Sequence, residues 1–414
     1  MNKVLLIAYH FPPLGGGGVF RTLKFTKYLP EFGYKPHVLT VKNPMYRIKD
    51  PTLIREIPPS AKVYRTFSFE HIILRAPRLL GINLKWFYVP DENIGWLPSA
   101  VRQGEKIIRK ANIDIVYATA PIFTSFLIGF LLKRKTGKPL VVDYRDPWTQ
   151  NVFIEYPSKL HKKIEDKLEK FVLETADHVI VTSDPMKHHL VEKYPFTKGK
   201  IDTITNGFDP EDFKNLTVKK DKEKFVIAYT GSLYGRRTGE KVFMAFRDLI
   251  KANPELETKI QVLITGLISK QDVFSIEKFG LKNVIKLLGY RSHKESLSLM
   301  ANADILLLMM SLEEVCNARS GTLTIPGKVF EYLGMKRPIL AIVPPGPAAN
   351  IIRSTKTGVV VSPQDTGVIA QTILKLFQDW KNGTLEVLES DISKYDRRVL
   401  TQKLVNVFQQ VQVK

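Results

Sequence analysis

Short apolar runs alternate with amphipathic stretches along most of the chain. The runs have the length and the branched or aromatic content of buried strands, and the stretches between them carry apolar residues at helical spacing. Strands are expected at 3–9, 36–41, 61–67, 114–119, 139–144, 177–183 and 200–207, and again at 225–231, 259–266, 284–290, 304–310, 338–344 and 358–363. Because this alternation occurs twice, it predicts an α/β protein with two consecutive doubly wound parallel sheets.

The helical windows and one polar segment divide the chain into two domains. Clear helical windows lie at 99–110, 160–175, 241–251, 293–301 and 395–411. The charged segment 215–224 has no apolar period, which is typical of an exposed linker. We therefore predict a first domain of residues 1–214, closed by a C-terminal helix at 395–414, and a second domain of residues 215–394.

The composition is that of a globular protein. Its 414 residues, with 44% hydrophobic and 25% charged side chains, suffice for two packed domains. The longest apolar runs are shorter than the roughly 18 residues that span a bilayer, so no transmembrane helix is predicted. The N-terminal apolar run meets two prolines rather than a cleavage site, and Cys316 is the only cysteine. A cytoplasmic protein without disulfides is the expectation.

The chain is strongly basic, with a formal net charge of +21 at pH 7. Nucleic acid, anionic lipid and phosphorylated substrates are all attracted by such a charge. Nucleic-acid binding is disfavoured because no known binding module accompanies the charge. The stretch 67–90 interleaves aromatic residues and leucines with Arg75, Arg78 and Lys85. It could contact an anionic membrane surface, or form a pair of core helices with outward cations.

A run of glycines, Gly15–Gly18, follows the first predicted strand and precedes a helix. Glycines without Cβ atoms let backbone amides approach a phosphate closely, although a flexible turn is the simpler alternative. The run is not a dinucleotide fingerprint, because Phe20 occupies the position of its third glycine. It also lacks the Gly-Lys-Ser/Thr ending of a P-loop.

Charged residues follow the strand predicted at 139–144. Asp143, Arg145 and Asp146 cluster at its carboxyl end, where ligands of open α/β sheets bind. They contact a ligand or form a local ion pair. The segment 203–213 contains Asn206 followed by a glycine. Asparagine and glycine are common in tight turns, so a turn is enough to explain Asn206 without a ligand.

A glycine turn in the second half of the chain carries cations. It follows the strand predicted at 225–231 and contains Gly231, Ser232, Arg236 and Arg237. Arginines beside helix amides can hold a diphosphate through charge-assisted hydrogen bonds. Solvated arginines are the alternative.

The segment 319–344 is the most specific in the sequence. Pro326 and Gly327 open a short helix, Lys328 lies in its first turn and Glu331 lies one turn further on. The first-turn amides can face a phosphate, and Glu331 can accept hydrogen bonds from ribose hydroxyls. A capped helix with a solvated polar face is the alternative. HExxH, CxxC and GxSxG patterns do not occur, so no metal site and no hydrolase nucleophile are predicted.

Taken in order, these segments resemble the family 4 glycosyltransferases of the GT-B fold over essentially the whole chain. The resemblance is carried by FPPLGGGGVFR, ITNGFDPEDF, YTGSL, NADILLLMMS and GKVFEYL followed by PILA. It implies two facing Rossmann-like domains, an acceptor bound mainly to the first, a nucleotide-sugar bound mainly to the second, and transfer with retention of configuration. No metal cofactor is expected. Synthesis of bacterial cell-surface polysaccharide, on a glycan or lipid-linked acceptor, is the role that this implies.

The candidate site residues are assigned on the motifs and on this resemblance. Catalytic roles fall to Arg237, Lys328, Glu331 and Asp146. Donor binding is assigned to Gly16, Gly17, Gly18, Gly231, Ser232, Arg236, Gly266, Tyr290, Pro326 and Gly327. Acceptor binding is assigned to Arg21, Arg145 and Asn206.

Two positions depart from the family pattern. Leu323 stands where the first glutamate of a pair is usual, and Ser232 stands where an arginine is usual. These departures leave a catalytically silent nucleotide-binding scaffold open. A nucleotide-sugar epimerase is the other alternative, because it shares two facing Rossmann-like domains.

Overall fold

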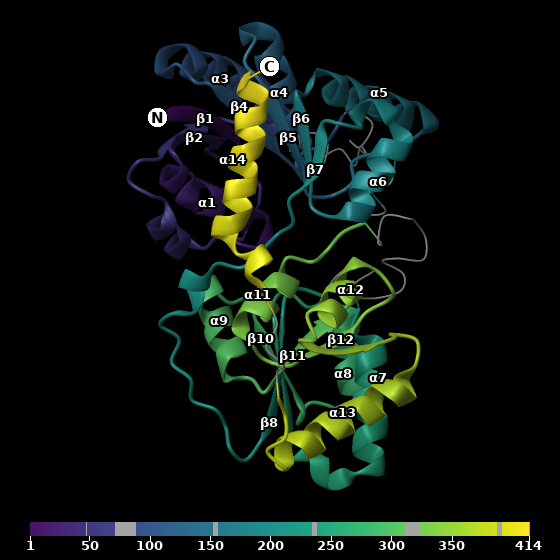
Figure 1. Ribbon diagram of the computed structural model, residues 1–414. Helices are drawn as coiled ribbons and strands as arrows, with labels where there is room; N and C mark the ends of the chain where they lie inside the picture. The colour runs from purple at the N-terminus through teal and green to yellow at the C-terminus, as the bar shows by residue number, and fades with distance from the viewer. Residues whose placement is uncertain are drawn as a thin grey trace. The chain divides into compact units, whose positions relative to one another are not determined.

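The computed structural model describes residues 1–46, 48–70, 88–151, 156–233, 238–310, 323–386 and 391–413. The chain forms two compact units (Figure 1). The first comprises Met1–Asn206 together with Arg397–Lys414, and the second comprises Gly207–Asp396. Among the described residues, no helix is long and apolar enough to cross a membrane.

The first unit contains a seven-stranded parallel sheet with the order β3-β2-β1-β4-β5-β6-β7. Its strands are β1 (Asn2–Ile7), β2 (Tyr34–Val41), β3 (Lys62–Thr66), β4 (Ile115–Thr119), β5 (Leu140–Tyr144), β6 (His178–Val181) and β7 (Ile201–Thr203). Its helices are α1 (Gly17–Tyr28), α3 (Leu97–Ala111), α4 (Thr124–Thr136), α5 (Lys159–Thr175), α6 (Asp184–Lys193) and α14 (Arg397–Val413). Short 3-10 helices lie at η1 (Leu29–Phe32), η2 (Pro51–Glu56), η4 (Ile94–Trp96) and η5 (Pro195–Thr197).

The second unit contains a six-stranded parallel sheet with the order β10-β9-β8-β11-β12-β13. Its strands are β8 (Phe225–Thr230), β9 (Ile260–Thr265), β10 (Ile285–Gly289), β11 (Ile305–Met309), β12 (Ile339–Ile342) and β13 (Gly358–Val361). Its helices are α7 (Glu240–Ala252), α8 (Lys270–Lys278), α9 (His293–Asn302), α11 (Lys328–Met335), α12 (Pro347–Ser354) and α13 (Thr366–Lys381). The 3-10 helices are η6 (Pro210–Phe213), η7 (Pro254–Glu257) and η8 (Ser393–Tyr395).

Each sheet has one point at which the strand order reverses. In the first sheet it lies between β1 and β4, where Val4 is in register with Ile115. In the second sheet it lies between β8 and β11, where Ile227 is in register with Ile305. Crevices outside the carboxyl ends of the strands at such a switch point are the usual ligand sites of this architecture.

Local signals in the sequence set several helix ends. The side chains of Ser158 and Ser183 accept hydrogen bonds from backbone N–H groups in the first turns of α5 and α6. Ser292 and Glu295 form a capping box at α9. Such caps satisfy donors that have no partner inside the helix.

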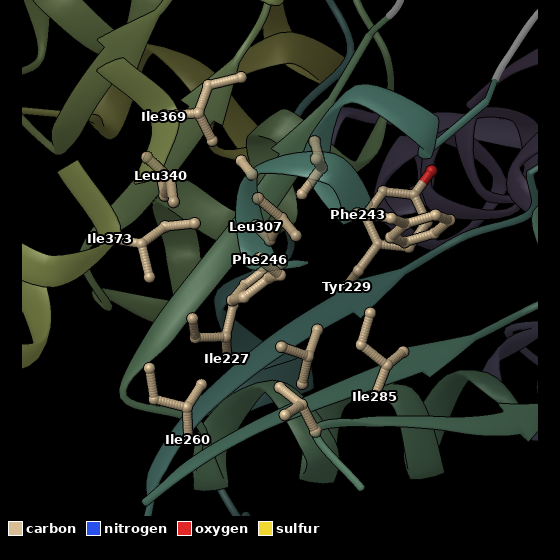
Figure 2. Packing of buried hydrophobic residues seen from close by; sticks show 14 of the residues in the cluster. Ile227, Tyr229, Phe243, Phe246, Ile260, Ile285, Leu307, Leu340, Ile369 and Ile373 are labelled. Atoms are coloured by element: carbon tan, nitrogen blue, oxygen red, sulfur yellow. The ribbon is translucent and has the colours of Figure 1, made fainter. Parts of the chain in front are cut away.

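The cores of both units are apolar. In the second unit, isoleucine, leucine and aromatic side chains from β8, β9 and β11 meet those of α7 and α13, as Figure 2 shows. In the first unit, α14 packs beside α1 (yellow and purple in Figure 1). Phe408 of α14 lies 5.4 Å from the ring of Tyr34 and 6.2 Å from that of Tyr117, measured between ring centroids. The predicted closing helix is therefore part of the first core.

The two units divide after Asn206, so residues 207–214, which the sequence-based boundary placed in the first domain, lie in the second unit. The backbone N–H of Phe208 donates to the carbonyl of Tyr395 at 3.0 Å. Phe208 and Phe213 also pack in the apolar cluster around α11. These contacts tie the segment to the second unit before the polar stretch 215–224 begins.

Candidate functional site

The glycine run lies at the start of α1, beside the switch point of the first sheet. Gly16 precedes the helix with φ of 82°, and a Cβ atom there would lie 2.7 Å from the hydroxyl of Tyr46. A Cβ atom on Gly18 would lie 2.7 Å from Nδ1 of His10. Two ring systems therefore require glycine at these positions. Gly17 faces open space instead.

A small cavity lies at the carboxyl ends of β1 and β4. Its lining residues come from the segment after β1, from α1, from the segment after β4 and from the end of β5: Ala8, Tyr9, His10, Thr22, Thr119, Ala120, Pro121, Ile122 and Arg145. Three buried polar atoms of this lining have no hydrogen-bond partner among the described residues: Nδ1 of His10, Oγ1 of Thr22 and Nε of Arg145. Buried polar groups are normally paired, so the cavity is suited to a polar ligand group.

Arg145 joins the glycine run to the end of β5. Its Nη1 donates to the carbonyl of Gly18 at 2.7 Å and its Nη2 to the carbonyl of Gly17 at 3.2 Å. Burial, with the Arg145 charge as a smaller cause, lowers the pKa of His10 to about 4. The imidazole is therefore neutral at pH 7 and has a nitrogen that can accept a hydrogen bond.

Arg21 and Asp143 form a buried ion pair beneath this cavity. Nε and Nη2 of Arg21 donate to the two carboxylate oxygens at 2.8 and 2.7 Å. Burial opposes ionisation, but the Arg21 charge and the hydrogen bonds from Arg21, Tyr117 and Thr119 hold the pKa of Asp143 below its usual value. Arg21 also donates to the carbonyls of residues 204 and 205, just before Asn206. With 1% of its surface exposed, Arg21 is placed to support the site rather than to meet a ligand.

In the second unit, glycines gather at the carboxyl ends of β8, β9 and β10. Gly231 has φ of 139° and Gly266 has φ of 118°. A Cβ atom on Gly266 would lie 2.5 Å from the backbone of Gly231. The N–H of Gly266 donates to the carbonyl of Gly289 at 2.9 Å. These turns are tight because the backbone approaches itself here.

The side chain of Lys328 fills the turn after β8. Its Nζ lies 3.9 Å from the ring centroid of Tyr229, and a Cβ atom on Gly231 would lie 2.2 Å from this nitrogen. The glycine thus gives an ammonium group room at the switch point. Lys328 is the first residue of α11, after Pro326 and Gly327, and the Cβ position of Gly327 faces open space.

The neighbouring residues of α11 connect it to the sheet and to α9. The hydroxyl of Tyr332 accepts from the backbone N–H of Thr230 at 3.0 Å and lies 3.2 Å from the carbonyl of Leu307. Glu331 lies 3.1 Å from Nε2 of His293, at the start of α9. The structure therefore brings Lys328 to the switch point at which Gly231 lies, and it places Glu331 beside the start of α9.

The remaining predicted donor residues are placed as follows. Oγ of Ser232 accepts from the N–H of Leu267 at 2.9 Å and so joins the ends of β8 and β9. Tyr290 follows β10 and is exposed, whereas Leu323 is buried. Arg236 and Arg237 lie outside the described residues. Asp146 follows Arg145 and is half-buried.

Sequence reasoning missed His10, Thr22 and His293. His10 lies three residues after the end of β1 and precedes the glycine run, so its place after a strand was an available signal. Thr22 and His293 become visible only once the helices are packed. Within either unit taken alone, the described residues bring no three metal-ligating side chains together.

Comparisons with known proteins agree with this architecture. Residues 15–212 match the Glycosyltransferase Family 4 model and residues 224–379 match the model for Glycosyl transferases group 1. An uncharacterised glycosyltransferase of Methanocaldococcus jannaschii is 26% identical over 320 residues, which are 74% of each chain.

Solved structures extend the likeness to nearly the whole length. Sucrose-phosphate synthase of Thermosynechococcus elongatus has a TM-score of 0.70 at 17% identity and covers 99% of both chains. A glycosyltransferase of Rickettsia africae has a TM-score of 0.68 at 18% identity and covers 99% of this chain and 98% of its own. The E. coli trehalose-6-phosphate protein solved with UDP-2-fluoro glucose has a TM-score of 0.65 at 11% identity, again with 99% of both chains covered. The two matched models together span most of the sequence, and the chain is a glycosyltransferase of family 4 with the GT-B fold.

Proposed function

We propose that the protein moves a sugar from a nucleotide-sugar donor to a glycan or lipid-linked acceptor, with retention of configuration, in bacterial cell-surface polysaccharide synthesis. The donor is assigned mainly to the second unit and the acceptor mainly to the first. The assignment of the donor depends above all on the Lys328 ammonium, which lies in the glycine turn after β8. A buried cation at a switch point is suited to a diphosphate.

The donor chemistry follows from charge. Cleavage of the bond between sugar and diphosphate builds negative charge on the leaving group, and a cation held in place stabilises that charge more in the transition state than in the ground state. In this proposal Lys328 and Arg237 neutralise the diphosphate, and Glu331 accepts hydrogen bonds from ribose hydroxyls. The other donor residues are Gly16, Gly17, Gly18, Gly231, Ser232, Arg236, Gly266, Tyr290, Pro326 and Gly327. No metal takes part.

The acceptor is assigned to the cavity beside the glycine run. The cavity suits a hydroxyl group better than a phosphate, because it is small and its lining combines one N–H donor, one hydroxyl and one neutral imidazole. Arg145 and Asn206 contact the acceptor in this proposal, while Arg21 holds the end of β5 in place. Asp146 is the side chain proposed to receive the acceptor proton.

Two further observations support a nucleotide-sugar donor. The matched families are glycosyltransferases, which favours transfer over epimerisation. The fold neighbour solved with UDP-2-fluoro glucose has such a donor bound. We place the reaction in the cytoplasm, at the inner face of the plasma membrane, where a lipid-linked acceptor is reached.

A thermal-shift screen of UDP-, GDP-, ADP- and dTDP-sugars tests the proposal, followed by a transfer assay with the donor that stabilises the protein. Stabilisation by one donor together with transfer to a glycan or lipid-linked sugar supports it. Binding without transfer or hydrolysis would instead favour the catalytically silent scaffold, in line with Leu323 and Ser232.

A further inference from the structure

Helix α5 of the first unit buries two carboxylates and exposes part of its apolar surface. Its buried side carries Glu165 and Glu169, which are 4% and 2% exposed, beside the apolar residues Val172 and Leu173. Its outward side carries Leu160, Ile164 and Phe171, which are 64%, 39% and 53% exposed. A helix that only covers a sheet places these classes of side chain the other way round.

Specific contacts hold the carboxylates inside. Trp148 donates its indole N–H to Glu165 at 2.8 Å. Glu169 accepts from the hydroxyls of Thr149 and Tyr194 at 2.7 and 2.8 Å, and from Lys193 at 2.9 Å. Burial raises the pKa of Glu165 to about 7. These contacts fix the rotation of α5, so Leu160, Ile164 and Phe171 stay on its outward side.

The outward side consists of two parallel rows. Leu160, Ile164, Leu168 and Phe171 recur at intervals of three or four residues, which places them along one line of a helix. The lysines at 159, 163, 167 and 170 recur at the same intervals beside them. We call these two rows together the α5 face. An exposed apolar row of this kind marks a surface that something covers.

We propose that the α5 face docks on an anionic lipid bilayer. The apolar row enters the boundary between headgroups and acyl chains, and the lysine ammonium groups remain among the lipid phosphates. The charge of the lysine row is complementary to anionic lipid, and the chain as a whole carries +21. A second copy of the chain fits less well, because a twofold contact would bring this lysine face against an identical one. Docking by the α5 face brings the protein to the membrane in which the proposed lipid-linked acceptor lies. To that extent the proposal rests on the proposed function.

Vesicle sedimentation with the full chain tests the inference. Vesicles of phosphatidylcholine with phosphatidylglycerol are expected to carry the protein down, and pure phosphatidylcholine vesicles to carry down much less. The double variant Leu160→Gln, Phe171→Gln is expected to lower the partition coefficient onto anionic vesicles by at least about tenfold. Phe274→Gln is the matched control, because Phe274 is 61% exposed on α8 of the second unit.

A charge test complements the apolar one. The double variant Lys163→Glu, Lys167→Glu is expected to weaken binding to anionic vesicles by about tenfold or more at low salt, since each lysine near such a surface contributes to attraction. Added salt is expected to weaken the binding of the unaltered protein in the same direction. Unchanged melting temperatures establish that both double variants remain folded.

Equal vesicle binding by the unaltered protein and by Leu160→Gln, Phe171→Gln would overturn the inference. A dimer that depends on the α5 face in sedimentation velocity, without vesicle binding, would overturn it too. Glu331→Ala separates this inference from the proposed function. That variant is expected to lose nucleoside diphosphate affinity and to keep vesicle binding, so a failure of sugar transfer leaves the membrane result standing.

Discussion

The two switch points use glycine for different purposes. In the first unit, Gly16 and Gly18 make room for the rings of Tyr46 and His10. In the second, Gly231 makes room for the ammonium of Lys328. The same sheet architecture therefore produces a cavity with a neutral imidazole in one unit and a turn with a buried cation in the other. This contrast supports the assignment of a hydroxyl acceptor to the first unit and of a diphosphate to the second.

Removing the buried carboxylate under the first switch point is expected to have the largest effect. Asp143→Ala leaves the Arg21 charge buried without its partner, which costs about 3–5 kcal/mol of unfolding free energy. Urea denaturation of the full chain measures the change. Asp248→Ala is the control, because its ion pair with Arg247 lies at the surface and is worth less than about 1 kcal/mol.

The pKa of Asp143 also gives this loss a pH dependence. Because the folded-state pKa lies below the usual value, the carboxylate stabilises the native state above the unfolded pKa of about 4. That contribution is lost as the pH falls through the lower folded pKa. The unaltered protein and Asp143→Ala should therefore converge in stability at acid pH. A constant difference across the acid range would argue against the pairing.

Lys328→Gln removes the ammonium group from the switch point of the second sheet. It removes a charge-assisted contact worth about 1.5–3 kcal/mol, so the affinity for a nucleoside diphosphate is expected to fall about 10- to 150-fold. Isothermal titration measures this. Lys336→Gln, at the exposed other end of α11, should bind as the unaltered protein does. Unchanged affinity in Lys328→Gln would place the diphosphate elsewhere.

Arg145→Gln sharpens the contrast, because it alters the first unit alone. The loss of the Arg145 hydrogen-bond donors is expected to raise the acceptor KM by about tenfold, roughly 1.4 kcal/mol, and to lower nucleoside diphosphate affinity less than Lys328→Gln does, because Arg145 reaches the proposed donor residues Gly17 and Gly18 only through their carbonyls. Steady-state kinetics at saturating donor and titration of the diphosphate separate the two quantities. Arg134→Gln on the exposed side of α4 serves as the control. A weakened donor with an unaltered acceptor KM would reverse the assignment of the units.

Substitution of His10 is expected to have the smallest effect, and that effect is on stability. Its folded pKa of about 4 lies below the unfolded value of 6.5, so the unfolded chain binds the proton first as the pH falls. Stability is full above pH 6.5 and declines toward pH 4. His10→Asn is expected to remove about 1 kcal/mol of the stability difference between pH 7 and pH 5.5. Denaturation at both pH values measures it. His37, whose pKa is also about 4, is present in both proteins and cancels.

The sequence predicted the fold because the fold depends on local periodicity. The window at 160–175 corresponds to α5 (Lys159–Thr175), and the window at 241–251 lies within α7 (Glu240–Ala252). The positions of Gly231, Gly327 and Lys328 at strand and helix ends could be inferred in the same way. Each of these features is encoded in a few consecutive residues.

Contacts between residues distant in sequence could not be predicted. The Lys328 ammonium enters the turn of Gly231, and His293 meets Glu331, only because the sheet order places β8 beside β11 and α9 beside α11. Arg21 was expected to face the acceptor as a basic residue of the glycine motif. Its partner Asp143 lies on β5, far from α1 in the sequence, and no local pattern shows that the pair is buried.

The packing of α14 into the first core constrains the order in which the chain matures during synthesis. The ribosome makes the whole second unit before it makes Leu404 and Phe408, which belong to the first core. Until then, Tyr34 and its apolar neighbours on the first unit lack their cover. The first unit therefore stays incompletely folded and prone to aggregation until the second unit has been synthesised. The rate of translation through residues 207–396 sets how long this incomplete state lasts.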